Sequence, residues 1–417
     1  MKEIMQSSQK SNSAVHLKIL IHTQFYPPEM GAPQARLSDL ARRLQAMGHS
    51  VEILTAIPNY PTGKLFQGYP RFSHREVIDG IPVTRSWIIP SAKPSLLHRL
   101  VSYFSFMFSS LVAGLFLKRS FDIVITESPP LFLAFSGWLL SRIKGAKWIM
   151  NISDLWPDSA IYVGILSEKD FVYRVLKRFE HFLYRRASLV TGQSREIVGE
   201  IKRQVPEVST YHLSNGVDVE NFSPARRDEE VRKSYIREGE VGFVYAGLHG
   251  LFQGLDQIIA AAGNIDGTSA RFVLIGDGPV KKDLMQDAKS QKLSNVDFHD
   301  PIPHRMIPLV IASLDVAVIT LKSSIRGAVP SKIYEAMASG VPILLVATGE
   351  ATEIVRNAGC GLIVAPGDIE GLVKAIRELA GNAELRASLG KAGRQAAVSF
   401  YDRQQIASRF NDALIKL

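Results

Sequence analysis

Short apolar strands alternate with helices along this chain, and the alternation occurs twice. The first run has a strand at 17–22 (LKILIH), a helix over 34–47 and a strand at 51–55. The second run has strands at 242–245, 272–275, 296–299 and 316–320, with helices over 255–262 and 280–290. Strands joined by helices build parallel sheets with ligand sites at their carboxyl edges. The sequence therefore predicts an α/β fold with two doubly wound, Rossmann-like domains.

The length of 417 residues suits two domains of about two hundred residues each. We expect a disordered polar segment at 1–14, a first domain at 15–205, a second domain at 206–398 and a final amphipathic helix at 399–417. The first fourteen residues lack the apolar run of a secretory signal. The single cysteine, Cys360, excludes an intramolecular disulfide and fits a reducing compartment. The expected location is cytoplasmic.

The positive charge lies in the first half of the chain. Residues 1–200 hold 24 Lys and Arg against 15 Asp and Glu, whereas residues 201–417 hold 25 of each sign. A basic half of a protein binds nucleic acid, anionic membrane or anionic substrates. No nucleic-acid recognition motif accompanies this charge, so we do not expect a nucleic-acid partner.

An uncharged apolar stretch, 100–117, lies among the basic residues of the first domain. Arg99 precedes it, and Lys118 and Arg119 follow it. Its length makes a membrane-spanning helix one reading, although its four serines and the strand that resumes at 121–126 oppose that reading. A buried helix that covers the sheet is the second reading. The third is a helix partly exposed to lipid, because apolar surface beside basic residues docks on anionic membrane.

The stretch 324–346 (SIRGAVPSKIYEAMASGVPILLV) combines a loop, a short helix and a buried strand. Pro330 suits the start of the helix, and Ser331 can accept a hydrogen bond from an N–H of its first turn. Free N–H groups at a helix N-terminus attract anions, and Lys332 adds a full charge there. Glu335 lies three residues on, so it either shares a ligand with Lys332 or pairs with it.

Two aspartates follow the strand expected at 147–152, where open α/β sheets bind ligands. Asp154 is a candidate for chemistry, whereas helix capping is the better interpretation of Asp158. Gly31 precedes the first helix and allows backbone to approach a phosphate or sugar. The chain has no HExxH motif, no Walker-type GxxxxGK[ST] motif and no Asp-x-Asp. These absences favour a diphosphate ligand bound without metal.

Five segments together resemble a known family. They are FYPPEMGAPQARLSDLARRLQAMGHSVEILT at 25–55, DLWPDSA at 154–160, LSNGVDVENFSP at 213–224, FVLIGDGP at 272–279 and PSKIYEAMASGVPIL at 330–344. In this order they resemble the retaining GT-B glycosyltransferases of family four. The chain is most similar to bacterial L-fucosamine transferases of O-antigen and capsule assembly.

The resemblance implies two Rossmann-like domains that face each other across a cleft, with the last helix crossing back to the first domain. It also implies metal-free transfer of a sugar from a nucleotide diphosphate donor, UDP-linked in our expectation, with no cofactor. Asp154, Lys332 and Glu335 are the expected catalytic residues. The donor-binding residues that it implies are Gly31, Gly247, Gln253, Gly276, Ile302, Arg326, Ser331, Lys332, Ile333 and Glu335.

The chain departs from the family pattern at several positions. Ser153 stands where the family has an active-site histidine, and Gly327 where it has the first of two glutamates. Leu248 and Gln253 replace the usual arginine and lysine beside the diphosphate. We hypothesise that Lys332, with Arg326 nearby, supplies the missing charge.

The expected acceptor is a polyprenyl-diphosphate-linked saccharide. The first domain would bind it on the inner face of the bacterial cytoplasmic membrane, with Arg99, Lys118 and Arg119 near the anionic surface. Two alternatives stay open from the sequence. One is a nucleotide-sugar epimerase with the same fold, and the other is a non-catalytic sugar-nucleotide binding subunit.

Overall fold

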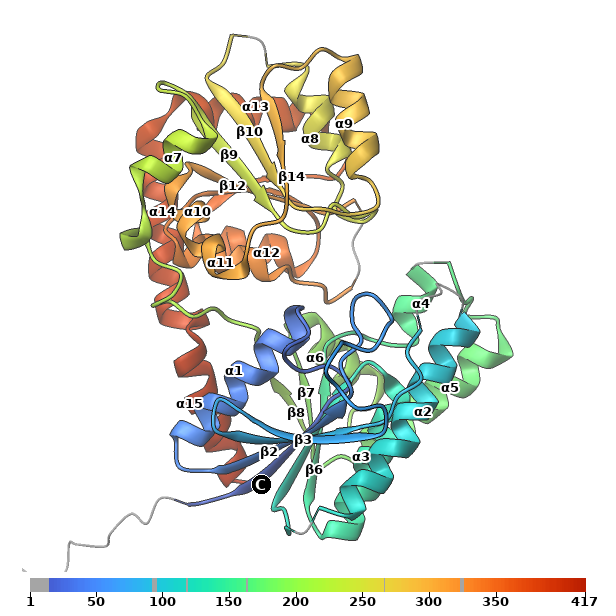
Figure 1. Cartoon of the computed structure of the whole chain (residues 1–417). Coiled ribbons are helices and arrows are strands. Elements are labelled where there is room, and N and C mark those ends of the chain that lie inside the picture. Colours follow the sequence, from blue (N-terminus) through green and yellow to red (C-terminus); the bar gives the residue numbers. More distant parts are fainter. Residues whose placement is uncertain (1–14, 92–95, 118, 163, 266, 323–325) are drawn as a thin grey trace, which may run out of the picture.

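The computed structural model describes residues 15–91, 96–117, 119–162, 164–265, 267–322 and 326–417. The disorder expected at 1–14 and the membrane contact expected at Lys118 lie outside these residues. Figure 1 shows two α/β domains, one above the other, with the long helical run α14 and α15 along one side. The predicted α/β fold class is confirmed.

The first domain contains an eight-stranded sheet. Its order is β3-β4-β2-β1-β5-β6-β7-β8, and all neighbours are parallel except β3 and β4. The strand order reverses between β1 and β5, which creates a ligand-binding edge at their carboxyl ends. The strands are β1 Lys18–His22, β2 Ser50–Ala56, β3 Ser73–Ile78, β4 Ile81–Ser86, β5 Ile123–Ser128, β6 Lys147–Ile152, β7 Leu189–Gly192 and β8 Thr210–His212.

The second domain contains a six-stranded parallel sheet in the order β11-β10-β9-β12-β13-β14. Its order reverses between β9 and β12, so a second ligand edge lies there. The strands are β9 Val241–Ala246, β10 Ala270–Ile275, β11 Val296–His299, β12 Val316–Thr320, β13 Ile343–Val346 and β14 Gly361–Val364.

Helices cover both faces of each sheet. In the first domain they are α1 Ala32–Ala46, α2 Leu96–Leu115, α3 Leu131–Lys144, α4 Asp158–Tyr162, α5 Phe171–Arg186 and α6 Arg195–Gln204. In the second they are α7 Glu229–Tyr235, α8 Asp256–Ala262, α9 Lys281–Ser290, α10 Ile307–Ser313, α11 Ser331–Ala338, α12 Glu350–Ala358, α13 Ile369–Gly381 and α14 Ala383–Ala396. A π-helical turn, Ala397–Tyr401, leads into α15, Arg403–Ile415.

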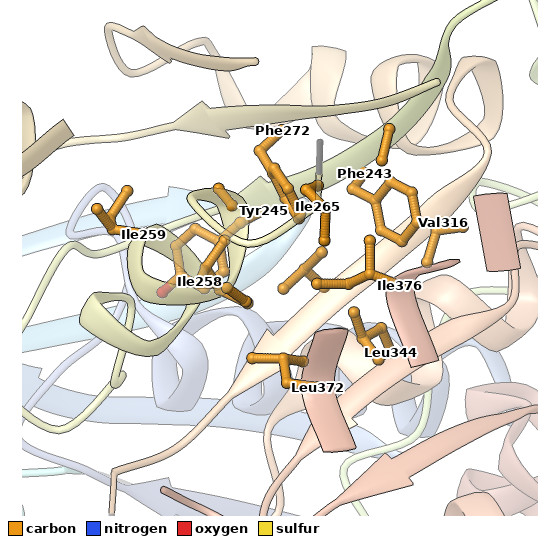
Figure 2. Packing of buried hydrophobic residues seen from close by; sticks show 14 of the residues in the cluster. Phe243, Tyr245, Ile258, Ile259, Ile265, Phe272, Val316, Leu344, Leu372 and Ile376 are labelled. Atoms are coloured by element: carbon orange, nitrogen blue, oxygen red, sulfur yellow. The ribbon is translucent and has the colours of Figure 1, made fainter. Parts of the chain in front are cut away.

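Apolar side chains from the strands fill a core on each face of each sheet. Figure 2 shows one core of the second domain, where Phe243 and Phe272 lie among residues from α8 and α13. The other face buries Ile333 and Met337 of α11 against β12 and β13. These cores fix α11 on its sheet, with its first turn at the carboxyl edge.

The chain crosses between the domains later than the boundary expected at 205. Strand β8 pairs with β7 and completes the first sheet, which therefore extends to His212. The chain returns through α15, whose Phe410 and Leu414 lie in the same core as Leu37 and Leu44 of α1. Both domains thus depend on residues from the end of the sequence.

The uncharged stretch forms α2, which packs beside α3 over the first sheet. Ser102, Ser105 and Ser110 are buried on its inner side, while Phe104 and Phe108 are exposed. Among the described residues, no helix is both long enough and apolar enough to cross a membrane. The spanning reading is therefore wrong, because this helix packs on the first domain, with Phe106 fully buried in an apolar cluster with residues of that domain.

Candidate active site

Lys332 lies at the carboxyl edge of the second sheet, where the strand order reverses. Its Nζ atom is 5.1 Å from the centre of the Tyr245 ring on β9. The same amine lies 2.7 Å from where a β-carbon on Gly247 would be. Burial lowers the pKa of Lys332, and the Glu335 carboxylate opposes that shift. An anionic ligand at this edge would therefore stabilise the charged amine.

The N-terminus of α11 begins at Ser331 and has no side-chain cap. The sequence suggested that Ser331 caps the first turn. Ser331 does not do so, because its Oγ donates a hydrogen bond to Glu335 Oε1 at 3.2 Å. In the part of the chain that the structure describes, Lys332 and Glu335 form no ion pair with each other. The two side chains therefore have different nearest partners, the Tyr245 ring for Lys332 and Ser331 for Glu335, although the charge of Glu335 still acts on Lys332.

The loops that follow β9 and β10 each contain a glycine near the carboxyl edge where Lys332 lies. Gly276, with a φ of 145°, lies so close to Gly247 that a β-carbon would be 1.8 Å from the Gly247 carbonyl oxygen. This contact lets the backbone after β9 and β10 approach closely, as a phosphate-binding edge requires. The Gln253 side chain lies against Gly250 in the same region.

Two of the expected donor-binding residues contribute to packing. The Ile333 side chain is fully buried in the core, and its N–H bonds the Pro330 carbonyl. Ile302 packs on the apolar cluster around Ile236 and Val310.

Asp154 follows β6 at the carboxyl edge of the first sheet. Burial raises the pKa of its carboxyl group, while hydrogen bonds from the Ser159 side chain and the Leu155 backbone oppose the shift. Asp158 is occupied elsewhere, because Lys177 Nζ lies 2.8 Å from its Oδ2 and the Tyr173 hydroxyl donates to it. Of the two aspartates, Asp154 is the one without an ion-pair partner among the described residues.

Two family models match consecutive parts of the chain. The model "Glycosyl transferase 4-like domain" matches residues 31–216, and "Glycosyl transferases group 1" matches residues 226–396. Together they cover most of both domains. The chain is a group 1 glycosyltransferase with the GT-B fold.

Known proteins are similar to this glycosyltransferase over much of their length. The probable glycosyltransferase WbjE of Pseudomonas aeruginosa is 28% identical, over 63% of this chain and 66% of WbjE. The putative colanic acid biosynthesis glycosyl transferase WcaI of Escherichia coli is 25% identical, over 94% of this chain and 98% of WcaI. The crystal structure of Anabaena HepE with UDP and glucose superposes with a TM-score of 0.72 at 19% identity, covering 96% of this chain and all of that one. WbjE and WcaI are both named as glycosyltransferases, in agreement with the two family models.

The glycosyltransferase contains a buried ion pair that the sequence did not predict. Arg36 Nη2 lies 2.5 Å from Glu127 Oε1 and 2.6 Å from Ser153 Oγ. Arg36 Nη1 lies 3.0 Å from Gln193 Oε1 and 2.9 Å from Asn215 Oδ1. This network joins α1 to the residues at and after the ends of β5, β6 and β7, and it holds Ser153 beside Asp154. Its signal in the sequence was a charged residue on the apolar stripe of α1, in line with Leu40 and Leu44.

The sequence analysis also did not identify His249 as a residue of the site. Its ring is fully buried in the loop after β9, and both ring nitrogens lack a hydrogen-bond partner among the described residues. Burial lowers the pKa of the imidazole, and the positive charges of Lys281 and Lys332 add to the shift. A neutral ring therefore supports the loop beside Lys332.

The remaining expected site residues are exposed or have partners other than Lys332. Arg326 Nη1 is 3.1 Å from Glu200 Oε2 of the first domain, so this cation already has a partner. Gly31 is exposed at the start of α1. Arg119 donates to the Ser50 hydroxyl at 3.1 Å, and Arg99 is exposed on the first turn of α2.

Proposed function

We propose that this glycosyltransferase transfers a sugar from a nucleoside diphosphate donor with retention of configuration and without a metal ion. The observation that carries the proposal is Lys332 at the uncapped start of α11, above Gly247 and Gly276. Helix N–H groups and a buried ammonium stabilise the negative charge that develops on a leaving diphosphate. Glu335, one turn further on, suits the paired hydroxyls of a ribose.

In the proposed reaction, the acceptor hydroxyl attacks the anomeric carbon from the side of the leaving group. The bond between that carbon and the phosphate oxygen breaks, and the proton of the hydroxyl passes to the departing phosphate. The protein positions the two substrates and neutralises charge, so no covalent intermediate is needed. Asp154 orients the acceptor hydroxyl from the first domain.

The proposed donor is a UDP-linked hexose, N-acetylated or 6-deoxy, and the proposed acceptor is a polyprenyl-diphosphate-linked saccharide of surface polysaccharide assembly. The role of WcaI in colanic acid biosynthesis supports the polysaccharide part of this proposal, and the UDP in the HepE structure supports the nucleotide. The exposed apolar side of α2 supports a lipid-linked acceptor. The proposed location is peripheral, on the inner face of the bacterial cytoplasmic membrane.

Replacing Lys332 tests the proposal. Lys332→Met keeps the length of the side chain and removes its charge, so turnover with a UDP-sugar should fall by about two orders of magnitude or more. UDP binding, measured by calorimetry, should weaken in the same variant. Lys391→Met is the matched control, because Lys391 is exposed on α14 and should behave as the wild type.

Two outcomes would contradict the proposal. Normal turnover in Lys332→Met would remove Lys332 from catalysis. Formation of an isomer from the donor alone would indicate epimerisation instead of transfer.

A further inference from the structure

The N-termini of two helices from different domains face each other beside the candidate site. Helix α6 belongs to the first domain and α12 to the second. Glu350 of α12 accepts hydrogen bonds from the N–H groups of Arg195 at 2.8 Å and Glu196 at 2.7 Å. Glu196 of α6 accepts in return from the Glu350 N–H at 2.8 Å. Each helix therefore receives a carboxylate at its N-terminus from the other domain, and in α6 this adds to the cap that its own Ser194 provides.

The same Glu196 carboxylate holds the loop that leads into α11. Its second oxygen accepts a hydrogen bond from the Gly327 N–H at 2.7 Å. One helical turn further along α6, Glu200 pairs with Arg326 at 3.1 Å. The contacts of α6 with the second domain thus fall on α12 and on Arg326 and Gly327, which lie five and four residues before Ser331.

Two glycines allow this close approach. Gly327 has a φ of 77°, and a β-carbon there would lie 2.4 Å from Ile197 of α6. Gly349, at the start of α12, has a φ of 74° and would place a β-carbon 3.0 Å from Glu196 Oε1. A side chain at either position meets both backbone strain and a neighbour. No glutamate fits at Gly327 while the two domains are in this arrangement.

We infer that Glu196 and Glu350 form a reciprocal latch that closes the domains and positions α11 against the acceptor domain. This inference rests on the proposed function, since it assigns the latch to alignment of donor and acceptor. Neither carboxylate contacts a substrate in this scheme, so both are positioning residues.

The latch is reversible for a physical reason. A carboxylate at a helix N-terminus gains from the helix dipole and from charge-assisted hydrogen bonds. In the open arrangement, water replaces these bonds at both helices, so the net difference between the states is small. Closure brings the Lys332 edge and the Asp154 edge into one arrangement, and opening releases product.

The experiment measures the distance between two spin labels, one in each domain. Lys169→Cys, before α5, and Lys282→Cys, on α9, are exposed sites, and the native Cys360 is buried. In the labelled protein with UDP bound, we expect one narrow distance distribution. The double variant Glu196→Ala/Glu350→Ala should give a longer and broader distribution, and Gly327→Ala should reproduce it. Glu353→Ala, an exposed charge on the same turn of α12, is the control.

Kinetics on the same variants test the positioning role. Turnover should fall by roughly tenfold or more, because misaligned reactants lose rate steeply, while UDP affinity stays within about threefold of the wild type. The latch would be overturned if Glu196→Ala/Glu350→Ala and Gly327→Ala both gave the same distance distribution between the labels as the wild type. Unchanged turnover with an altered distribution would overturn the positioning role. Absence of sugar transfer in the wild type would reject the proposed function. The distances between the spin labels would still show whether Glu196 and Glu350 hold the domains together.

Discussion

At the scale of single residues, the environment of Asp154 illustrates how a site can oppose stability. Burial raises the pKa of this carboxyl group, so the folded state binds its proton more tightly than the unfolded state does. The associated stability is fully present below the unfolded pKa, about 3.9, and is lost as the pH rises through the folded pKa. At neutral pH the charged carboxylate therefore costs stability.

Asp154→Asn should raise the thermal unfolding midpoint at neutral pH, because the amide carries no charge to bury. The gain should vanish near pH 3, where the native carboxyl group is protonated in both states. Turnover should fall in the same variant, because the amide cannot orient the acceptor hydroxyl as a carboxylate does. Asp170→Asn is the control, since Asp170 is exposed. Full activity in Asp154→Asn would argue against the role proposed for this residue.

At the scale of elements, α2 has an unusual distribution of side chains. Two of its buried serines donate to carbonyls one turn back, Ser105 to Ser102 at 2.8 Å and Ser110 to Met107 at 3.1 Å, so these hydroxyls need no water. Its outer side exposes apolar side chains at helical spacing, with Phe108 63% exposed, and Phe116, the residue after the helix, is 72% exposed. The exposed set is Val101, Phe104, Phe108, Val112, Leu115 and Phe116. A contiguous apolar patch of this kind marks an interaction surface.

The α2 surface predicts binding to vesicles that contain anionic phospholipid. Phe108→Ser/Phe116→Ser should weaken binding in a sedimentation assay, because burial of each ring in lipid is lost. Raising the salt, or removing charge at Arg99, Lys118 and Arg119, should weaken it as well. Phe72→Ser is the matched control, as Phe72 is 70% exposed but lies outside α2. Failure of the wild type to bind any vesicle, at any salt concentration, would reject lipid docking.

At the scale of the whole molecule, the last helix completes the first domain. Phe410 of α15 is fully buried among residues of β1 and α1, and its ring lies 5.6 Å from that of Tyr211. The two domains are therefore joined both by the crossing after β8 and by a helix that shares the core of the first sheet.

Phe410→Ala should destabilise the first domain by about 3 to 5 kcal/mol, since it leaves a cavity in a packed core. Hydrogen exchange should rise in peptides from β1 and α1, although the substitution is close to the end of the chain. Phe400→Ala, at a residue 65% exposed, should change neither the stability of the first domain nor the hydrogen exchange in β1 and α1. Equal exchange in both variants would show that α15 contributes little to that core.

The sequence by itself determined most of the strands, their order along the chain and the start of α11, but it did not reveal β3, β8 or β14. Apolar periodicity and turn residues act within a few positions, so the strands at 147–152, 296–299 and 316–320 were predicted at their observed bounds. Lys332 was identified for the same reason, because its charge and the helix start are adjacent in the chain.

Only the tertiary structure decided the contacts between distant residues. Arg36 and Glu127 are 91 positions apart, and Glu196 and Glu350 are 154 apart. Neither pair can be recognised from neighbouring residues in the sequence. The order of the strands brings Arg36 and Glu127 together, and the approach of the two domains brings Glu196 and Glu350 together. The resemblance showed that Gly327 stands where the family has a glutamate, and the structure explains why this position is a glycine. Its positive φ and the contact with Ile197 leave no room for a side chain.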